Sequence, residues 1–144
     1  GTDAYNNNLD MFETMKYASY VQKGYRLDPA AMPYQKVFSM ATLEGARVLG
    51  MEEEIGSLEP GKKADITIVD LKHPRFQPVL RGEFSNILAN LVYSAHSDDV
   101  ETVIVDGRIV MENRVIKTID EDKALEDVAR SAEKLMQGVK QFIK

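Results

Sequence analysis

The sequence has no cysteine and no tryptophan, and it holds only two histidines, His73 and His96, among its 144 residues. Without cysteine the chain can form neither a disulfide bond nor a thiolate metal site, so a metal would need histidine or carboxylate ligands. Two histidines are too few for an ordinary histidine-rich zinc site. No apolar run approaches the roughly 18 residues of a membrane span, and no signal-peptide pattern is present. We therefore expect a cytoplasmic protein with no membrane partner.

Basic residues are outnumbered as well, with 18 Lys+Arg against 23 Asp+Glu and a formal net charge of −5. An acidic chain without a Lys/Arg cluster is a poor partner for nucleic acid, so we expect none. Hydrophobic residues make up 44% and charged residues 28%, which is typical of a soluble globular protein. The length suits one domain with its own core. Because the chain opens at Gly1 without an initiator methionine, we expect a piece of a longer protein.

Apolar spacing predicts helices in the first sixty residues. The stretch from Leu9 to Lys23 has helical spacing, and Gly24 is the expected stop. The stretch from Pro33 to Gly50 predicts two short helices that pack closely, with a break near Thr42, because a glycine lies inside the run.

Strands follow in the next sixty residues. Residues 64–70 form a β-branched strand candidate, and Asp106-Gly107 predicts a type I′ turn between two alternating strands. The apolar run from Ile87 to Tyr93 fits a strand or a helix equally well.

The tail predicts a helix that begins after Asp120, which can cap it. Apolar residues then repeat at spacings of three and four: Leu125, Val128, Ala132, Leu135, Val139 and Phe142. The stripe is compatible with a coiled-coil seam, but it spans fewer than four heptads. We expect it to pack on the body of its own protein.

Residue patterns alone define no catalytic site. Phosphate loops, nucleophile elbows and paired histidines at helical spacing are missing. Each histidine is interpreted as an ordinary loop residue, and Asp98-Asp99 and Lys62-Lys63 as solvated turns. On composition and spacing, the chain is an α+β module with no assigned activity.

Four strings resemble the metal-dependent amidohydrolase superfamily, in the family's own order. The strings are GTD with NNNLDMFE (residues 1–13), MAT…GA…LG (40–50), IGSLEPGKKAD (55–65), and NLVY with VIVDGR (90–108). Within the superfamily, NNNLDMFE and NLVYSA are most similar to the 5-methylthioadenosine/S-adenosylhomocysteine deaminases. One departure is the segment Ala4-Tyr5, which makes the loop before Asn6 slightly shorter than is usual in the family.

The resemblance implies the architecture. The full enzymes combine a metal-dependent (β/α)₈ hydrolase barrel with a β-sandwich built from both ends of the chain. Residues 1–52 would be the C-terminal segment of the TIM-like barrel, residues 53–118 part of the β-sandwich domain, and residues 119–144 a closing amphipathic helix. The sheet edges and apolar faces left unpaired in such a piece favour contact with a second copy, so we expect a homo-oligomer.

The resemblance also assigns Asp3 as metal ligand, catalytic residue and substrate-binding residue. In the family, one divalent metal is held by an HxH pair, a third histidine and this aspartate; the histidines would lie upstream. Zinc is the expected metal, with iron and manganese as alternatives. A carboxylate beside a divalent ion stays ionised and can serve as general base and then general acid. We expect this chain alone to bind little or no metal and to be inactive.

The implied reaction is hydrolytic deamination of a purine nucleoside such as methylthioadenosine or S-adenosylhomocysteine. Two alternatives within the superfamily are a triazine chlorohydrolase and a guanine deaminase, which act on related heterocycles. An alternative of another class is a non-catalytic module, derived from an amidohydrolase tail, that binds a partner through residues 125–142.

Overall fold

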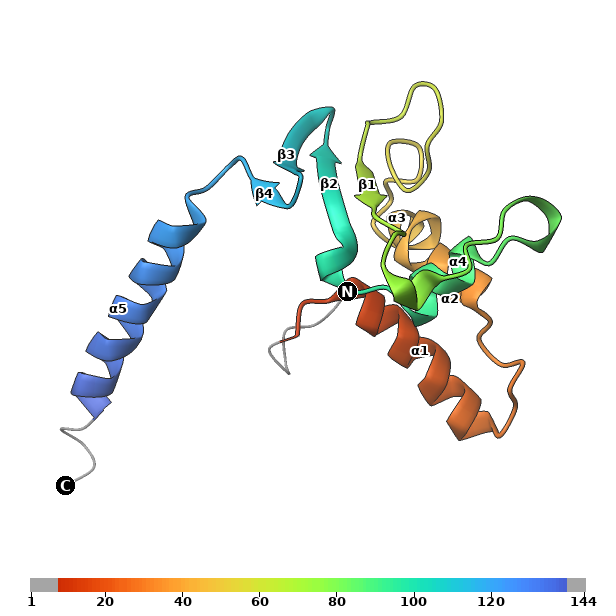
Figure 1. Cartoon of the computed structure of the whole chain (residues 1–144), viewed down its shortest axis with the longest axis horizontal. Helices are drawn as coiled ribbons and strands as arrows, with labels where there is room; N and C mark the ends of the chain where they lie inside the picture. Colours follow the sequence, from red (N-terminus) through yellow and green to blue (C-terminus); the bar gives the residue numbers. More distant parts are fainter. Residues whose placement is uncertain (1–7, 140–144) are drawn as a thin grey trace.

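The computed structural model describes residues 8–139 and confirms an α+β arrangement (Figure 1). The helices and strands follow one another in chain order: α1 (Met11–Arg26), α2 (Tyr34–Ala41), α3 (Leu43–Val48), β1 (Ile66–Val69), α4 (Ile87–Tyr93), β2 (Val100–Val105), β3 (Arg108–Glu112), β4 (Val115–Ile116) and α5 (Glu121–Val139). Three short 3₁₀ turns join them: η2 (Pro74–Phe76), η3 (Gly82–Phe84) and η4 (Ser97–Asp99). Helices α1–α4 gather beside the sheet, and α5 projects away from both.

The core lies between α1, α2 and α4. Each helix contributes one buried apolar side chain to it, namely Met15, Val37 and Val92. Helix α1 begins at Met11, after the predicted start at Leu9, and continues through Gly24 to Arg26, so the expected stop is wrong. The helix ends at Leu27, whose φ of 52° turns the chain so that its N–H reaches the Gly24 carbonyl. A glycine inside a helix weakens it but does not end it when the neighbouring turns are held by packing.

The predicted break at Thr42 is confirmed, because α2 ends at Ala41 and α3 begins at Leu43. Gly45 explains why the two helices pack so closely. A Cβ added there would lie 2.9 Å from the Met40 carbonyl oxygen, which is too close for any larger residue.

The four strands form one antiparallel sheet in the order β1-β2-β3-β4. The predicted hairpin is confirmed, since Asp106 and Gly107 have φ values of 49° and 75°, the left-handed pair that a type I′ turn requires. The run from Ile87 to Tyr93 resolves as helix α4. Residues 8–139 contribute a single sheet, so the two-layered sandwich stays a prediction.

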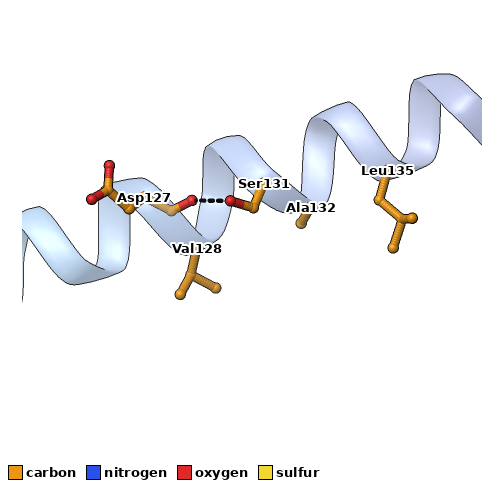
Figure 2. A pocket seen from close by; sticks show the side chains of 5 residues that line it. All are labelled: Asp127, Val128, Ser131, Ala132 and Leu135. Carbon is orange, nitrogen blue, oxygen red and sulfur yellow. Dashed lines mark hydrogen bonds between the residues drawn. The ribbon is translucent and has the colours of Figure 1, made fainter.

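Helix α5 does not pack on the other described residues, so its packing on the body of its own protein stays a prediction. Among residues 121–139 no side chain is buried, and Leu125, Val128 and Leu135 are 69%, 67% and 68% exposed. Figure 2 shows Val128 and Leu135 directed to the same side of the helix. The predicted cap is confirmed by a 3.0 Å bond from the Lys123 N–H to the Asp120 carboxylate. Helical periodicity shows that a face is suited to burial, but it does not identify the surface that buries it.

Among the described helices, none combines the length and the apolar character that a membrane crossing needs.

Candidate functional site

Asp3, the candidate metal ligand and catalytic residue, lies outside the described residues, so its role stays a prediction. Within residues 8–139, no three side chains of histidine, aspartate and glutamate gather closely enough to hold a metal ion. The described part therefore does not by itself fit the zinc that the resemblance implies. What the structure does describe is the junction that follows Asp3 in the sequence.

The junction centres on the carboxylate of Asp10, which joins two distant parts of the chain. One oxygen accepts the Phe12 N–H at 2.8 Å and caps α1. The other oxygen accepts the Ser97 N–H at 3.0 Å, across 87 residues of sequence. Upstream, the Asp10 N–H donates to the Asn8 side chain at 2.8 Å. A single side chain therefore ties the entry of α1 to the turn that leads into β2.

The surroundings of Asp10 hold it in its ionised form. Burial raises its pKa, but the N–H groups of Ser97, Glu13 and Phe12 outweigh burial, so the pKa lies below its usual range. The His96 Nδ1 lies 3.9 Å from a carboxylate oxygen of Asp10 and 3.9 Å from one of Glu13. Asp10, Glu13 and His96 thus form a small polar cluster at the start of α1.

The other histidine serves a local structural purpose. His73 caps the 3₁₀ turn η2, where its Nδ1 accepts the Arg75 N–H at 3.2 Å. The structure does not bring His73 together with His96 as a metal site within the described residues. Both histidines are thus loop residues, as the sequence predicts.

Asp99 corrects the expectation of a solvated Asp98-Asp99 turn. Its side chain is only 5% exposed, and it accepts the His96 N–H at 2.9 Å and the Arg75 guanidinium at 3.1 Å. Asp98 stays exposed, as expected. The sequence feature that could have indicated this burial is the position of Asp99 three residues after His96, which is the spacing of a capping box.

Lys62 corrects the expectation of a solvated Lys62-Lys63 pair. Its side chain is 13% exposed, and its ammonium donates to the Glu52 carbonyl and, at 2.8 Å, to the Ser57 hydroxyl. Lys63 behaves as predicted on the surface, where the adjacent Glu54 carboxylate raises its pKa. Lys62 therefore folds residues 52–62 into a closed loop beside α3.

A broad apolar groove of about 1250 Å³ lies between the helices and one face of the sheet. Its walls come from helices α1 to α4, the loop after α3, and strands β1 and β2. Representative lining residues are Met11, Phe38, Val48, Leu49, Leu58 and Val103. Val48, Leu49 and Leu58 are 88%, 69% and 72% exposed. An uncovered apolar surface of this extent is typical of an interface.

The sequence profile of the amidohydrolase family matches residues 1–110. The chain belongs to the amidohydrolase family.

Within the family, the chain is similar in sequence and in structure to several deaminases. The chain is 45% identical to a 5-methylthioadenosine/S-adenosylhomocysteine deaminase of Thermoanaerobacter pseudethanolicus, over 95% of this chain and 31% of the relative. It is 40% identical to a 5'-deoxyadenosine deaminase of Methanobrevibacter smithii, over 97% of this chain and 32% of the relative. A crystal structure of an adenosine deaminase from Xanthomonas campestris with bound zinc is similar with a TM-score of 0.85 and 30% identity, over 93% of this chain and 29% of that one. The chain thus spans about 31% of the length of the curated relatives it matches.

Proposed function

We propose that this chain is part of a zinc-dependent amidohydrolase that removes the amino group of an adenosine-type nucleoside by hydrolysis. The observation that carries the proposal is the 45% identity to a methylthioadenosine/S-adenosylhomocysteine deaminase over 95% of the chain. The adenosine deaminase that resembles the fold contains zinc. Methylthioadenosine, S-adenosylhomocysteine and 5'-deoxyadenosine share an adenine amino group, which makes that group the proposed target.

Asp3 is the residue of this chain to which we assign the chemistry. A carboxylate is a suitable zinc ligand, and a bound zinc ion lowers the pKa of water to near neutrality. The Asp3 carboxylate is proposed to take the proton of the attacking water and to deliver it to the leaving amine. Water adds at the purine carbon that bears the amino group, and ammonia leaves.

The groove supports the view that more polypeptide belongs to the functional unit. Its apolar walls combine the helices assigned to the barrel segment, residues 1–52, with the sheet assigned to the β-sandwich, residues 53–118. An apolar surface shared by both segments is suited to bury further strands or helices of the same enzyme. We propose that the three remaining metal ligands, all histidines, lie in that further part.

We also propose a location, a substrate class and an oligomeric state for the enzyme. The enzyme is placed in the cytoplasm, with a purine nucleoside or a related heterocycle as its small-molecule substrate. It is proposed to be a homo-oligomer. The alternative of a non-catalytic binding module is favoured by one observation, the exposed apolar face of α5.

The test is an assay of the complete protein that contains this chain, with methylthioadenosine, S-adenosylhomocysteine, 5'-deoxyadenosine, guanine and a chlorotriazine as substrates. We expect ammonia release from the adenosine-type compounds. Asp3→Asn should lower kcat by at least about 100-fold and lower the zinc content. Asp28→Asn, in an exposed turn, is the matched control and should change neither. Turnover of guanine or the triazine alone would select one of the alternatives, and turnover of nothing would favour the binding module.

A further inference from the structure

The first turn of α1 is joined to η4, the short turn that leads into β2 (Figure 1). The Asp10 carboxylate accepts the Ser97 N–H at 3.0 Å. The His96 Nδ1 lies 3.9 Å from an oxygen of Asp10 and 3.9 Å from one of Glu13. The Asn8 side chain contacts the same two acidic residues, since its oxygen accepts the Asp10 N–H and its amide donates to Glu13. The chain is therefore tied to η4 from Asn8 onward.

The sheet and the segment after β1 hold η4 in turn. The Asp99 side chain is 5% exposed and accepts the Arg75 guanidinium at 3.1 Å. Directly after β1, the Asp70 N–H donates to the Asp99 carbonyl at 2.8 Å. From the turn between β3 and β4, the Arg114 guanidinium donates to the Asp98 carbonyl at 2.9 Å. A shift of η4 would break bonds to all three segments, so η4 links the start of α1 firmly to the sheet.

The bond from Ser97 to Asp10 does more than a helix cap requires. One oxygen of Asp10 already accepts the N–H groups of Phe12 and Glu13, which satisfies the start of the helix. The other oxygen accepts from a residue 87 positions away, and the Asp10 side chain is only 15% exposed. Hydrogen bonds to an ionised carboxylate are short and strong. This bond therefore fixes the direction from which the chain enters α1.

That direction matters because Asp3 lies upstream on the same segment. Asn8 follows Asp3 by five positions in the sequence, and five residues span at most roughly 18 Å. A functional carboxylate needs supporting residues that hold it within about 0.5 Å of its working position. A fixed point so close in the sequence is suited to provide part of that support.

We propose that η4 positions Asp3, because Ser97 and His96 fix the start of α1 and with it the segment that carries Asp3. The inference rests on the proposed function, since it takes Asp3 to be the catalytic carboxylate. It adds that residues in the segment assigned to the β-sandwich, 53–118, act as positioning residues for the reaction without touching the substrate.

The test removes a single N–H group from η4 in the complete protein. Ser97→Pro deletes the donor to Asp10 and should leave the turn intact, because Ser97 is the first residue of η4 and His96 before it is extended, with φ −135° and ψ 166°. Pro74 already occupies the same place in η2. We expect kcat to fall roughly 10- to 100-fold with KM nearly unchanged, and zinc to bind at least about 10-fold more weakly.

A second variant reaches the same defect by another route. Asp10→Asn still caps α1, but it can turn an NH₂ group instead of an oxygen toward the Ser97 N–H. It should reproduce the losses in kcat and in zinc affinity. Lys62→Met is the control for general instability, because it breaks shielded bonds in the loop after α3 and should change neither quantity. Every variant is assayed at a temperature at which circular dichroism shows it to be folded.

The other outcomes overturn the inference. Unchanged kcat and zinc affinity in both variants would show that the bond to η4 does not place Asp3. A rise in KM alone, or an equal loss in Lys62→Met, would do the same. The zinc measurement does not need the deaminase reaction, so weaker zinc binding in variants of a protein that deaminates no adenosine-type substrate would refute only the proposed function. Deamination that neither variant impairs would refute only this inference.

Discussion

At the scale of single residues, a few polar side chains hold loops and separate segments of the chain in place. Asp10 links α1 to the turn before β2, and Lys62 closes the loop after α3. The buried Asp99 carboxylate accepts a hydrogen bond from the Arg75 guanidinium. Such contacts are worth more than surface ion pairs because their loss leaves a buried donor or acceptor without a partner.

Asp10→Ala should destabilise the protein by about 2 kcal/mol, since it removes both a helix cap and a charged hydrogen bond to a distant segment. The measurement is urea unfolding at neutral pH. Asp28→Ala is the matched control, because Asp28 also accepts an N–H two residues ahead, from Ala30, but joins no distant segment. We expect the control to cost about 0.5 kcal/mol or less. Equal losses in the two variants would contradict a linking role for Asp10.

The contribution of Asp10 should also depend on pH. Its pKa is lowered in the folded protein, so its stabilisation is fully present above the unfolded pKa of about 3.9 and is lost as the pH falls through the folded value. The difference in unfolding free energy between the unmodified protein and Asp10→Asn should therefore shrink below about pH 4. A difference that stays constant from neutral pH to pH 3 would show that ionisation of Asp10 contributes nothing.

Lys62→Met should cost about 1–3 kcal/mol, because it leaves the Glu52 carbonyl and the Ser57 hydroxyl without their ammonium donor. Lys63→Met changes the neighbouring side chain in the same way but removes only an exposed ion pair, so it should cost less than Lys62→Met. Thermal unfolding of the two variants under the same conditions compares their losses of stability. The roles are wrongly assigned if Lys63→Met is the more damaging change.

At the scale of elements, local patterns predicted most of the secondary structure and little of its packing. The Asp106-Gly107 hairpin and the break at Thr42 depend on backbone preferences of a few neighbouring residues, and both were predictable. The end of α1 was not, because Leu27 takes a left-handed conformation that its residue type does not suggest. The burial of Asp99 depends on Arg75, which lies 24 residues away in the sequence, and the burial of Lys62 depends on how the loop 52–62 closes around it. The assignment of Asp3 as a metal ligand came only from the family resemblance. A single aspartate forms no sequence motif that would mark it as a ligand.

Gly56 lies in the loop after α3 and approaches that helix closely. Its φ is 93°, and an added Cβ would lie 2.8 Å from the Ala46 Cβ and 3.0 Å from the Leu43 Cα on helix α3. Gly61 has a similar φ of 96° but open space around it. Gly61→Ala should therefore cost about 1–2 kcal/mol from backbone strain alone, and Gly56→Ala at least about 1 kcal/mol more from the clash. Chemical denaturation of both variants separates the two effects, and similar losses would mean that α3 moves away at no cost.

At the scale of the whole molecule, the length of the chain suits a complete domain, but its small core and its exposed apolar surfaces do not. A chain of 144 residues is long enough for a complete domain, yet the described core centres on a small cluster between three helices. The groove, the α5 face and the exposed Tyr17, Val21 and Tyr25 of α1 are all apolar surfaces open to solvent. Together with a match to about 31% of the curated relatives, they favour a portion of an enzyme whose larger part covers them.

Leu49→Glu tests this view because its expected effect depends on what surrounds the groove. In the complete protein, the variant should lose about 3 kcal/mol, because the carboxylate would be buried among apolar side chains. Residues 1–144 on their own should instead associate less at high concentration, since the same change places a charge on an open apolar surface. Phe84→Glu is the control: Phe84 is 78% exposed and lies outside the groove, so it should change stability by less than about 0.5 kcal/mol in the complete protein. Thermal unfolding measures the stability of the complete protein, and sedimentation measures the association of residues 1–144. If Leu49→Glu is as harmless as Phe84→Glu in the complete protein, the groove is an open surface there too, and the larger part of the enzyme must attach elsewhere.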